Sequence, residues 1–532
     1  MALARVAPLA LAAAGAAAAP GGWIARLEAN GFAVQEGEYG FFDMQTCKAA
    51  DTCYAINPLT PYGLSWLPRH PREAAAQVGY ENSCVRHRIC RGNASRPLSP
   101  SWRVDRGETV VILGRTPPES VYWSFAPTLY TRYHPAPFLP RPGSVDRMLV
   151  ACPPALLRGN RCEVFSGVND PVNHLTANTS GRGAPFAVDF ALVLSWDASS
   201  ERRTLDELRR AGHENVNVLR FPGGAGRLGV VAGDEDEWMA ILRVEGIKDE
   251  QQAKAFYAGA PYRTFRVTPP ASFVVQDEAL FASFDGRMRE RATGGRESAG
   301  GVGFEQLRRA LKRVQLEILR EEEASWRGVR RHVAATKFET FVNDSGYECL
   351  AHGTKCAGDC RDTIYAKATF LTRQMECMPL PSVGPCNPAE TALLSEEEGD
   401  AFFAFGVNHQ LTGQALYSSV TGYNFPKLAA VTGAIADDAY AGTAERYLGP
   451  ADAAARYLWV VKFARSCAGS AGLCVEIPAA SEDPAVSPLA LHEPLFFLER
   501  MYVNPKTNSG PAVSETILGG LLHFKPQRSI VV

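Results

Sequence analysis

The chain has 532 residues, more than a single hydrophobic core usually holds, which predicts two or three domains. Its formal net charge of −2 excludes the strong basic field that nucleic-acid or anionic-membrane binding requires. No later stretch approaches the roughly 20 unbroken apolar residues of a membrane span, so we expect no transmembrane segment.

The first 19 residues have the order of regions found in secretory signal peptides. A single charge at Arg5 precedes an apolar run, and an alanine-rich tail follows. An organelle transit peptide is the alternative, but such peptides are rich in Ser and Arg. We therefore interpret residues 1–19 as a signal peptide and expect the mature protein to be secreted or lumenal.

Residues 20–283 are expected to form an N-terminal α+β domain. The segment 199–212 carries apolar residues at helical spacing, and a second helix is expected at 249–258, before a strand at 263–267. Further strands are predicted from β-branched and aromatic runs bounded by Gly, Pro, Asn and Asp, at 109–114, 121–125, 186–194, 216–221 and 238–244.

A polar turn at 165–174 carries the first candidate catalytic pair, Asp170 and His174. A histidine that a carboxylate orients can act as a general acid or base near neutral pH. Asn169 and Asn173 in the same turn are candidates for binding an anion or a hydroxyl group. The alternative is a structural turn whose Asn and Asp side chains bond to their own backbone.

Aromatic residues gather between Tyr122 and His134. Aromatic faces on a strand can form a platform for a sugar or another flat ligand, which makes Tyr122 and Trp123 candidate binding residues. The alternative is that these side chains belong to the core, because aromatic residues bury the largest apolar area.

The segment 284–303 is charged and rich in glycine and lacks an apolar period, which predicts a flexible linker or a long exposed loop. Within it, Arg-Glu-Ser-Ala-Gly-Gly around Ser298 resembles the nucleophile elbow of carboxylesterases. That turn requires a small residue where Arg296 stands, and no apolar strand precedes it. We therefore do not expect Ser298 to be a nucleophile.

Residues 304–532 are expected to form a second α+β domain. It opens with an amphipathic helix, since apolar residues recur in steps of three and four from Phe304 to Ile318. Such a stripe is typical of a core face, and a coiled-coil seam is the alternative. Strands are predicted later in the chain, at 402–407, 415–423, 457–463 and 494–503.

The strand end at 405–409 repeats part of the earlier polar turn, because Gly-Val-Asn also occurs near His174. His409 is therefore a second candidate acid or base, and Asn408 and Tyr417 are candidate binding residues. A histidine whose hydrogen bonds are satisfied in the core is the alternative interpretation.

Twelve of the thirteen cysteines form six pairs of close sequence neighbours, which in an oxidising compartment predicts local disulfides. Cys349 is then left over, although a bond between Cys349 and Cys356 with a free Cys360 is equally allowed. An unpaired cysteine in a secreted chain can be a reactive thiol or an intermolecular link. The six predicted pairs are Cys47–Cys53, Cys84–Cys90, Cys152–Cys162, Cys356–Cys360, Cys377–Cys386 and Cys467–Cys474.

Zinc is the alternative for the run that contains Cys349, His352, Cys356 and Cys360, because thiolate and imidazole are its preferred ligands. The chain has no CxxC motif, and secretion favours oxidation. We therefore expect no metal site. The cofactor remains unknown.

The tripeptides that begin at Asn93, Asn178 and Asn343 are acceptors for N-glycosylation and agree with secretion.

No metalloprotease, nucleotide-binding, dinucleotide-binding or calcium-loop motif occurs in the chain. Two functions remain open. One is a secreted enzyme, for example a hydrolase, that uses His409, His174 and Asp170 for acid–base chemistry. The other is a noncatalytic extracellular protein that binds a small molecule, a carbohydrate or another surface. We expect no nucleic-acid partner, and the sequence does not predict the oligomeric state.

Overall fold

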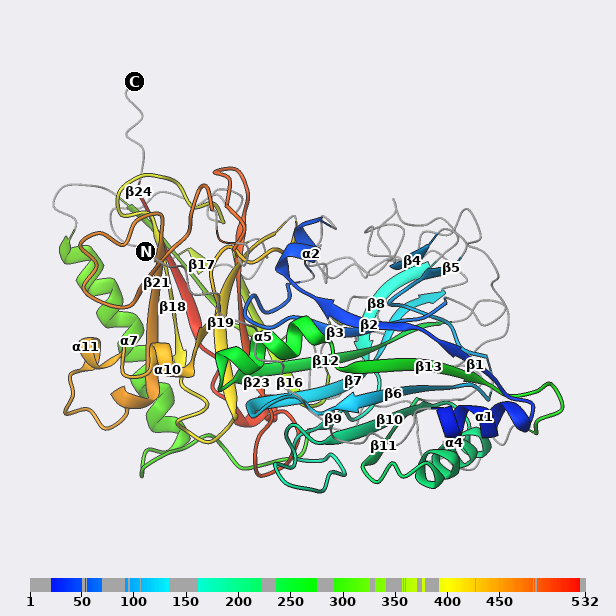
Figure 1. The fold of residues 1–532 in the computed structure, drawn as a ribbon. Helices are drawn as coiled ribbons and strands as arrows, with labels where there is room; N and C mark the ends of the chain where they lie inside the picture. Colours follow the sequence, from blue (N-terminus) through cyan, green and yellow to red (C-terminus); the bar gives the residue numbers. More distant parts are fainter. Residues whose placement is uncertain are drawn as a thin grey trace, which may run out of the picture.

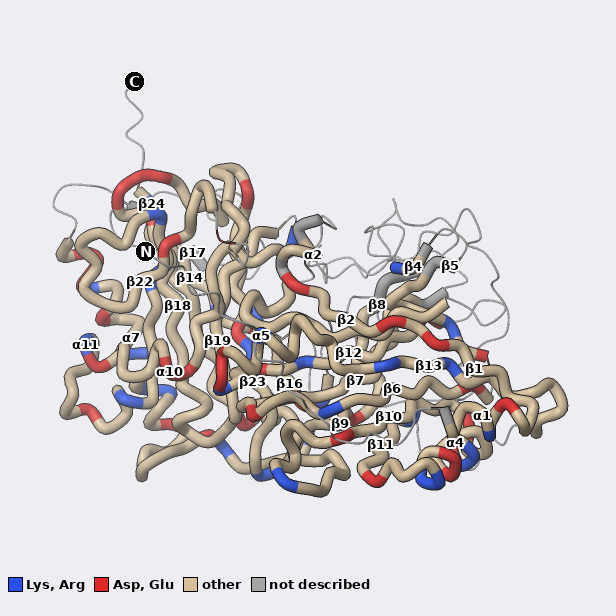
Figure 2. Tube along the Cα trace, in the orientation of Figure 1, with Lys and Arg blue, Asp and Glu red and all other residues tan. Residues whose placement is uncertain are grey.

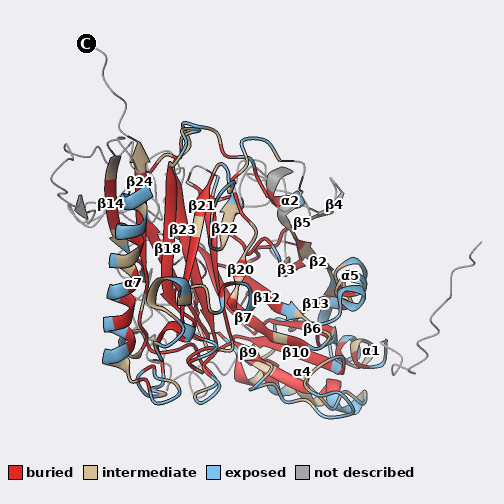
Figure 3. Cartoon of the chain, turned by 90° about the vertical axis from the view of Figure 1, so that its left-hand side faces the viewer, coloured by how far each residue is buried: buried red, intermediate tan, exposed pale blue. Residues whose placement is uncertain are grey.

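The computed structural model shows two halves, each built from two stacked β-sheets, with helices on the outer sides (Figure 1). The strands of one half run steeply across those of the other (Figures 1 and 3). The structure describes residues 21–49, 53, 55–68, 91–93, 96–105, 107–133, 161–221, 236–274, 291–325, 331–340, 356, 358, 360–370, 376–377, 392–425, 427–481, 483 and 486–526.

The outer sheet of the N-terminal half has the strand order β1-β13-β6-β10-β11. Its strands pair in antiparallel fashion except β10 and β11, which are parallel and are connected through helix α4 (Ala198–Arg210). Asp197 caps this helix by accepting a hydrogen bond from the Ser200 amide. The strands are β1 (Ala33–Glu36), β6 (Thr109–Arg115), β10 (Asp189–Ser195), β11 (Val216–Arg220) and β13 (Tyr262–Thr268).

The inner sheet of the N-terminal half has the order β2-β3-β12-β7-β8, with β9 paired to β7. Its strands are β2 (Glu38–Phe42), β3 (Tyr62–Trp66), β7 (Ser120–Tyr133), β8 (Arg161–Gly167), β9 (Val172–Asn173) and β12 (Glu237–Ile247). The remaining elements of this half are α1 (Gly21–Ala29), α2 (Met44–Ala49), α5 (Glu250–Gly259) and the separate pair β4 (Arg91–Asn93) and β5 (Arg96–Leu98).

The C-terminal half repeats this two-sheet plan. Its inner sheet has the order β15-β16-β23-β19-β20, with β15 (Glu339–Thr340), β16 (Thr363–Thr369), β19 (Tyr417–Asn424), β20 (Ile435–Ala436) and β23 (Leu495–Tyr502). Its outer sheet has the order β17-β14-β24-β18-β21-β22, with β14 (Arg331–Lys337), β17 (Glu376–Cys377), β18 (Ala401–Val407), β21 (Leu458–Ala464), β22 (Cys474–Glu476) and β24 (Gly520–Pro526). The helices are α7 (Phe304–Ser325), α10 (Asp437–Tyr440), α11 (Glu445–Leu448), η3 (Ala455–Tyr457) and η4 (Val513–Glu515).

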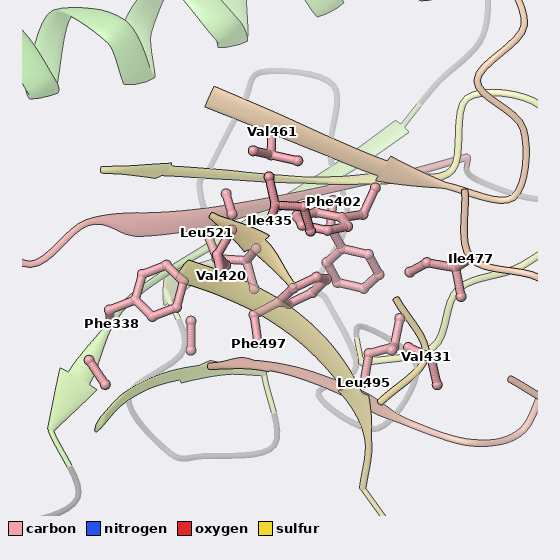
Figure 4. Close-up of a cluster of buried hydrophobic side chains, with 14 of the residues drawn as sticks. Phe338, Phe402, Val420, Val431, Ile435, Val461, Ile477, Leu495, Phe497 and Leu521 are labelled. Atoms are coloured by element: carbon pink, nitrogen blue, oxygen red, sulfur yellow. The ribbon is translucent and has the colours of Figure 1, made fainter. Parts of the chain in front are cut away.

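Five clusters of buried apolar side chains separate six layers. Helices α1 and α4 pack on the outer N-terminal sheet, and α7 packs on the outer C-terminal sheet through the apolar stripe that the sequence predicts. Each half has a core between its own two sheets. In the C-terminal core, side chains such as Phe402, Phe497 and Val420 from facing strands point toward one another (Figure 4). The fifth cluster lies between the two inner sheets.

Acidic and basic residues are interspersed over both halves (Figure 2). Most strand residues are buried, whereas one face of α7 is exposed (Figure 3). None of the helices that the structure describes is long and apolar enough to cross a membrane.

The mixed, strand-rich α+β class expected from the sequence is confirmed, and so are helices α4, α5 and α7. The domain boundary stays a prediction. Part of the expected linker is packed rather than exposed, because Arg291 and Glu297 are buried and hydrogen-bonded. The predicted signal peptide, residues 1–19, lies outside the described residues.

Two predicted disulfides, Cys47–Cys53 and Cys467–Cys474, are confirmed. The predicted Cys356–Cys360 bond is wrong. Cys356 is disulfide-bonded, but Cys360 is a buried free thiol that donates a hydrogen bond to Asp362. The free Cys360 of the alternative is therefore confirmed, whereas Cys349 lies outside the described residues. The other three pairs stay predictions, since they involve Cys84, Cys90, Cys152 and Cys386, which lie outside the described residues.

Candidate functional site

The two inner sheets face each other across a layer of aromatic and charged side chains, which we call the intersheet layer. Nearly all of these side chains are buried, and both halves of the chain contribute to them. We define the layer by Tyr62, Tyr122, Arg243 and Glu245 from the N-terminal half and by Tyr365, Tyr417, Tyr423, Arg500 and Tyr502 from the C-terminal half.

Strand alternation places these residues in the layer. In β12, Leu242 and Val244 face the N-terminal core. Successive strand residues point to opposite faces, so Arg243 and Glu245 face the other inner sheet. In β23, Phe497 faces the C-terminal core and its neighbours Phe496 and Leu498 face the layer. The same alternation directs Arg500 and Tyr502 into the layer.

A chain of hydrogen bonds crosses the layer at the loop before β16. The Arg243 guanidinium donates through Nη1 to Sγ of Cys360 at 2.7 Å and through Nη2 to the carbonyl of Gly358 at 2.5 Å. The Cys360 thiol donates to Oδ1 of Asp362 at 2.8 Å, and the Tyr122 hydroxyl donates to Oδ2 at 2.6 Å. These bonds join the two inner sheets through groups that are all buried.

The Cys360 thiol is a hydrogen-bonding group rather than a nucleophile. Burial raises its pKa to about 12, although the positive charge of Arg243 acts in the opposite direction. Because the thiolate is the nucleophilic form, a thiol that stays protonated at neutral pH is inert.

Arg500 is the second buried cation of the layer, with 1% of its surface exposed. Its guanidinium lies 5.6 Å from the ring centroid of Tyr365 and 5.3 Å from that of Tyr423. Nη2 donates to the carbonyl of Ala55. Nε and Nη1 make no hydrogen bond of standard geometry to any residue that the structure describes.

Glu245 is the acidic residue of the layer. Its Oε2 accepts hydrogen bonds from Nδ2 of Asn57 at 2.8 Å and from the hydroxyl of Thr60 at 2.7 Å. Burial raises the pKa of Glu245 to about 7, although these hydrogen bonds and the charge of Arg500 oppose the shift. The carboxyl is therefore only partly ionised at neutral pH.

The structure places the predicted turn at 165–174 at the edge of this layer. Asp170 pairs with Arg361 across the two halves, with Oδ2 2.9 Å from Nη1. His174 packs edge-on against Tyr122, with ring centroids 6.0 Å apart. Burial lowers the pKa of His174 to about 4, so the ring is neutral at neutral pH. The turn thus brings Asp170 and His174 to the layer, but the carboxylate pairs with an arginine instead of orienting the histidine.

The asparagines of this turn have structural roles. Asn173 accepts hydrogen bonds from the amides of Leu175 and Thr176, and its Nδ2 donates to the Asn508 carbonyl of the other half. Asn169 bonds to the backbone of Arg220. These contacts match the alternative of a turn whose side chains satisfy the backbone.

The two aromatic residues predicted to bind a ligand lie in different parts of the protein. Tyr122 lies in the layer, whereas Trp123 on the next position of β7 faces the N-terminal core, where it contacts Phe125 and Phe190. Tyr417, a candidate from the second half, also lies in the layer, and its hydroxyl accepts a hydrogen bond from Asn57 at 3.2 Å.

His409 lies away from the layer, fully buried within the C-terminal half. Its Nδ1 is 2.7 Å from Oε1 of Glu297, and its Nε2 is 3.3 Å from Oε1 of Glu499, close enough for an ion pair. Burial disfavours the charged ring, but the two carboxylates outweigh burial and raise the pKa of His409 to about 10. A ring that is already protonated at neutral pH cannot accept a proton as a general base.

Asn408 holds the turn that follows β18. Its Oδ1 accepts from the amide of Leu411 at 3.0 Å, and its Nδ2 donates to the carbonyl of Asp437 at 3.0 Å. The Asp437 carboxyl accepts two bonds from the Ser418 amide, and burial raises its pKa to about 6. Asn408 and His409 thus belong to a polar network inside the core and share no contact with Asp170 or His174.

The predicted zinc ligands Cys349 and His352 lie outside the described residues. In the part of the chain that the structure describes, no three His, Cys, Asp or Glu side chains are placed to hold a metal ion. Of the glycosylation acceptors, Asn178 is exposed, the side chain of Asn93 is not described, and Asn343 lies outside the described residues. Glycosylation stays a prediction.

No protein-family model matches the chain, and no curated protein matches it. The VPA0106 protein of Vibrio parahaemolyticus, a solved structure, is 11% identical with a TM-score of 0.30, over 81% of this chain and 88% of that one. An uncharacterised protein from Burkholderia cenocepacia is 10% identical with a TM-score of 0.33, over 92% of this chain and 81% of that one. TM-scores this low support no argument about fold or function.

The sequence carries a signal for two residues of the layer that the motifs above do not indicate. Arg243 and Glu245 interrupt an apolar run in β12, and Glu499 and Arg500 interrupt another in β23. A charged residue in a strand that is buried on both faces needs a partner or a function. Arg243 and Arg500 were therefore detectable as unusual, although their common location in one layer was not.

Proposed function

We propose that this chain is a noncatalytic secreted protein that binds a small molecule in the intersheet layer. The observation that carries the proposal is the state of Arg243 and Arg500. Both guanidinium groups are buried, and the described residues provide neither of them with an ion pair. Burying an unpaired ion costs several kcal/mol, and in native proteins such groups are satisfied by a ligand, water or a counter-charge.

The aromatic composition of the layer supports binding. Tyrosines offer a ring face for a flat or apolar group and a hydroxyl for a polar one. The Tyr365 and Tyr502 hydroxyls are 3.5 Å apart, and the ring centroids of Tyr122 and Tyr502 are 4.8 Å apart. Ligand sites commonly lie between the two halves of a chain and combine apolar walls with a few polar groups.

Acid–base catalysis is less well supported by the candidate residues. His409 is charged and sealed in the core, and His174 does not contact the carboxylate of Asp170. The free thiol of Cys360 is protonated. A secreted location agrees with the two confirmed disulfides, which form and persist in oxidising compartments.

The proposal is tested on the full chain purified from a secretory host. Native mass spectrometry would detect a retained small molecule, and thermal shift would report binding of phenol, benzoate, benzamide and glucose as probes. We expect at least one probe or retained molecule to raise Tm, and Tyr365→Phe and Tyr417→Phe to reduce that shift. Tyr447→Phe on α11, outside the layer, is the matched control. Binding that none of the layer variants changes would overturn the proposal.

A further inference from the structure

Arg500 occupies a position suited to one anionic group. Its guanidinium lies beside the rings of Tyr365 and Tyr423, and among the residues that the structure describes the carbonyl of Ala55 accepts its hydrogen bond of standard geometry. Nε and Nη1 are both buried and have no such acceptor among the described residues. Guanidinium donors that bind a carboxylate form hydrogen bonds about twice as strong as neutral ones.

The buried groups around Arg500 leave part of its positive charge unbalanced. Arg243 and Arg500 carry two positive charges, whereas the carboxyls bonded to the layer are Asp362, which Tyr122 and Cys360 contact, and Glu245, which is only partly ionised. The Glu245 carboxyl is already held by Asn57 and Thr60. A negative charge placed at the guanidinium of Arg500 would therefore be stabilised.

On these grounds, and resting on the function proposed above, we infer that the ligand is an organic carboxylate whose oxygens bind the guanidinium of Arg500 and whose body packs among the tyrosine rings of the intersheet layer. A carboxylate oxygen can accept a charge-assisted hydrogen bond from either Nε or Nη1, which lie on different edges of the guanidinium. The ring faces of Tyr365 and Tyr423 and the apolar neighbours Phe496 and Leu498 favour a flat or apolar body over a highly hydrated one.

The inference is tested by isothermal titration of the full chain with benzoate, benzamide and phenyl phosphate. These probes share a ring and differ in the charge and shape of the polar group. We expect benzoate to bind roughly tenfold or more tightly than benzamide, because only benzoate makes charge-assisted hydrogen bonds. Arg500→Gln should remove this preference and leave the affinity for benzamide within about twofold.

Two further variants distinguish binding at Arg500 from a general effect of the substitution on the protein. Arg456→Gln is the matched control, since Arg456 is exposed and also lies over a tyrosine ring, that of Tyr457. It should leave all affinities unchanged. If Arg500→Gln fails to fold, Tyr502→Phe provides the test, because it removes one hydroxyl of the layer and keeps the ring. We expect it to weaken benzoate binding a few-fold.

The outcomes distinguish the inference from the function on which it rests. Equal affinity for benzoate and benzamide, with both reduced by Tyr502→Phe, would overturn the carboxylate inference and leave the binding function standing. A preference for phenyl phosphate would overturn the carboxylate class. Benzoate binding that Arg500→Gln and Tyr502→Phe leave unchanged would overturn the assignment to Arg500. No binding of any probe at about 10 mM, with no retained molecule, would overturn both proposals.

Discussion

The guanidinium of Arg243 donates a hydrogen bond to the thiol of Cys360 at 2.7 Å, although β12 and the loop before β16 belong to different halves of the chain. The thiol in turn donates to Asp362, so it links a buried cation to a buried carboxylate. This role explains why an unpaired cysteine is found in a chain with disulfides. A disulfide at Cys360 would remove the hydrogen that Asp362 accepts.

Cys360 is therefore expected to be unreactive in the folded protein. Its pKa of about 12 implies a thiolate fraction on the order of 10⁻⁴ at pH 8, and its side chain is fully buried. Iodoacetamide at pH 8 should not label Cys360 in the native chain over hours, but should label it after denaturation without reductant, as peptide mapping would show. Cys360→Ser should remove the labelled peptide. Native labelling of Cys360 at the rate of free cysteine would contradict the buried, protonated thiol.

His409 is expected to make stability depend on pH. Its pKa in the folded chain, about 10, is above the value near 6.5 of the unfolded chain. The stability that it contributes is therefore complete below pH 6.5 and is lost as the pH rises through 10. Replacing it by Gln leaves Glu297 and Glu499 without their counter-charge and should cost about 3–5 kcal/mol at pH 6.

The measurement is the free energy of unfolding in guanidinium chloride at pH 6, 8 and 10. The difference between the wild type and His409→Gln should shrink as the pH rises toward 10. His492→Gln is the control, since His492 is exposed. A difference that stays constant across this range would show that His409 is uncharged at pH 6.

Glu245 is expected to make stability depend on pH in a lower range than His409 does. Burial raises its pKa to about 7 from the ordinary value near 4.5, so the folded chain binds the proton more tightly than the unfolded chain. Its contribution to stability is therefore complete below pH 4.5 and is lost as the pH rises through 7. Glu245→Gln keeps an oxygen for the Asn57 and Thr60 donors and should flatten this dependence between pH 5 and 8. Glu119→Gln, at an exposed carboxylate, should leave it unchanged.

The ionisation of Glu245 should also make the affinity for benzoate depend on pH. Ionised Glu245 repels a bound carboxylate, so benzoate affinity should fall as the pH rises through 7 and should stay level in Glu245→Gln. Benzamide binding should show no such trend in the wild type, and a parallel fall for benzamide would exclude charge repulsion. The groups that face Glu245 are Asn57, Thr60, Tyr257, Tyr417, Arg500 and Tyr502.

Gly358 is expected to tolerate no side chain. It has φ +73°, and a Cβ would lie 2.7 Å from the ring of Phe165. Its carbonyl also accepts the Arg243 bond. Gly358→Ala should destabilise the chain by roughly 2–4 kcal/mol, since left-handed strain and the clash add. Gly413→Ala is the matched control, because Gly413 has φ +71° and open space where the Cβ would lie. Equal losses of unfolding free energy in the two variants would show that Phe165 moves aside.

Most regular elements could be predicted because their signals are local. The stripe of α7, the apolar spacing of α4 and the β-branched runs of β6 and β10 depend on neighbours in sequence. The polar turn at 165–174 was predicted to be a candidate catalytic turn from its own residues, but its partners Arg361 and Asn508 come from the other half of the chain. Local patterns carry no information about such contacts.

The surroundings of the second candidate site could not be predicted for a related reason. The sequence around His409 shows a polar strand end, but it does not show that Glu297 and Glu499 enclose the ring and hold its proton. Glu297 lies in a segment whose composition predicts a linker, since glycine and charge usually indicate exposure. Burial of that carboxylate depends on the tertiary fold, which composition does not reveal.

The neighbours Glu499 and Arg500 on β23 point to opposite sides, one toward His409 and the other toward Glu245. If β23 slipped by one residue against β16 and β19, the positive side chain would turn toward the protonated histidine and the negative one toward Glu245. Like charges would then meet on both faces in a medium with little screening. The two charges therefore disfavour a one-residue slip of β23 on both of its faces, and either residue alone would disfavour the slipped pairing on one face only.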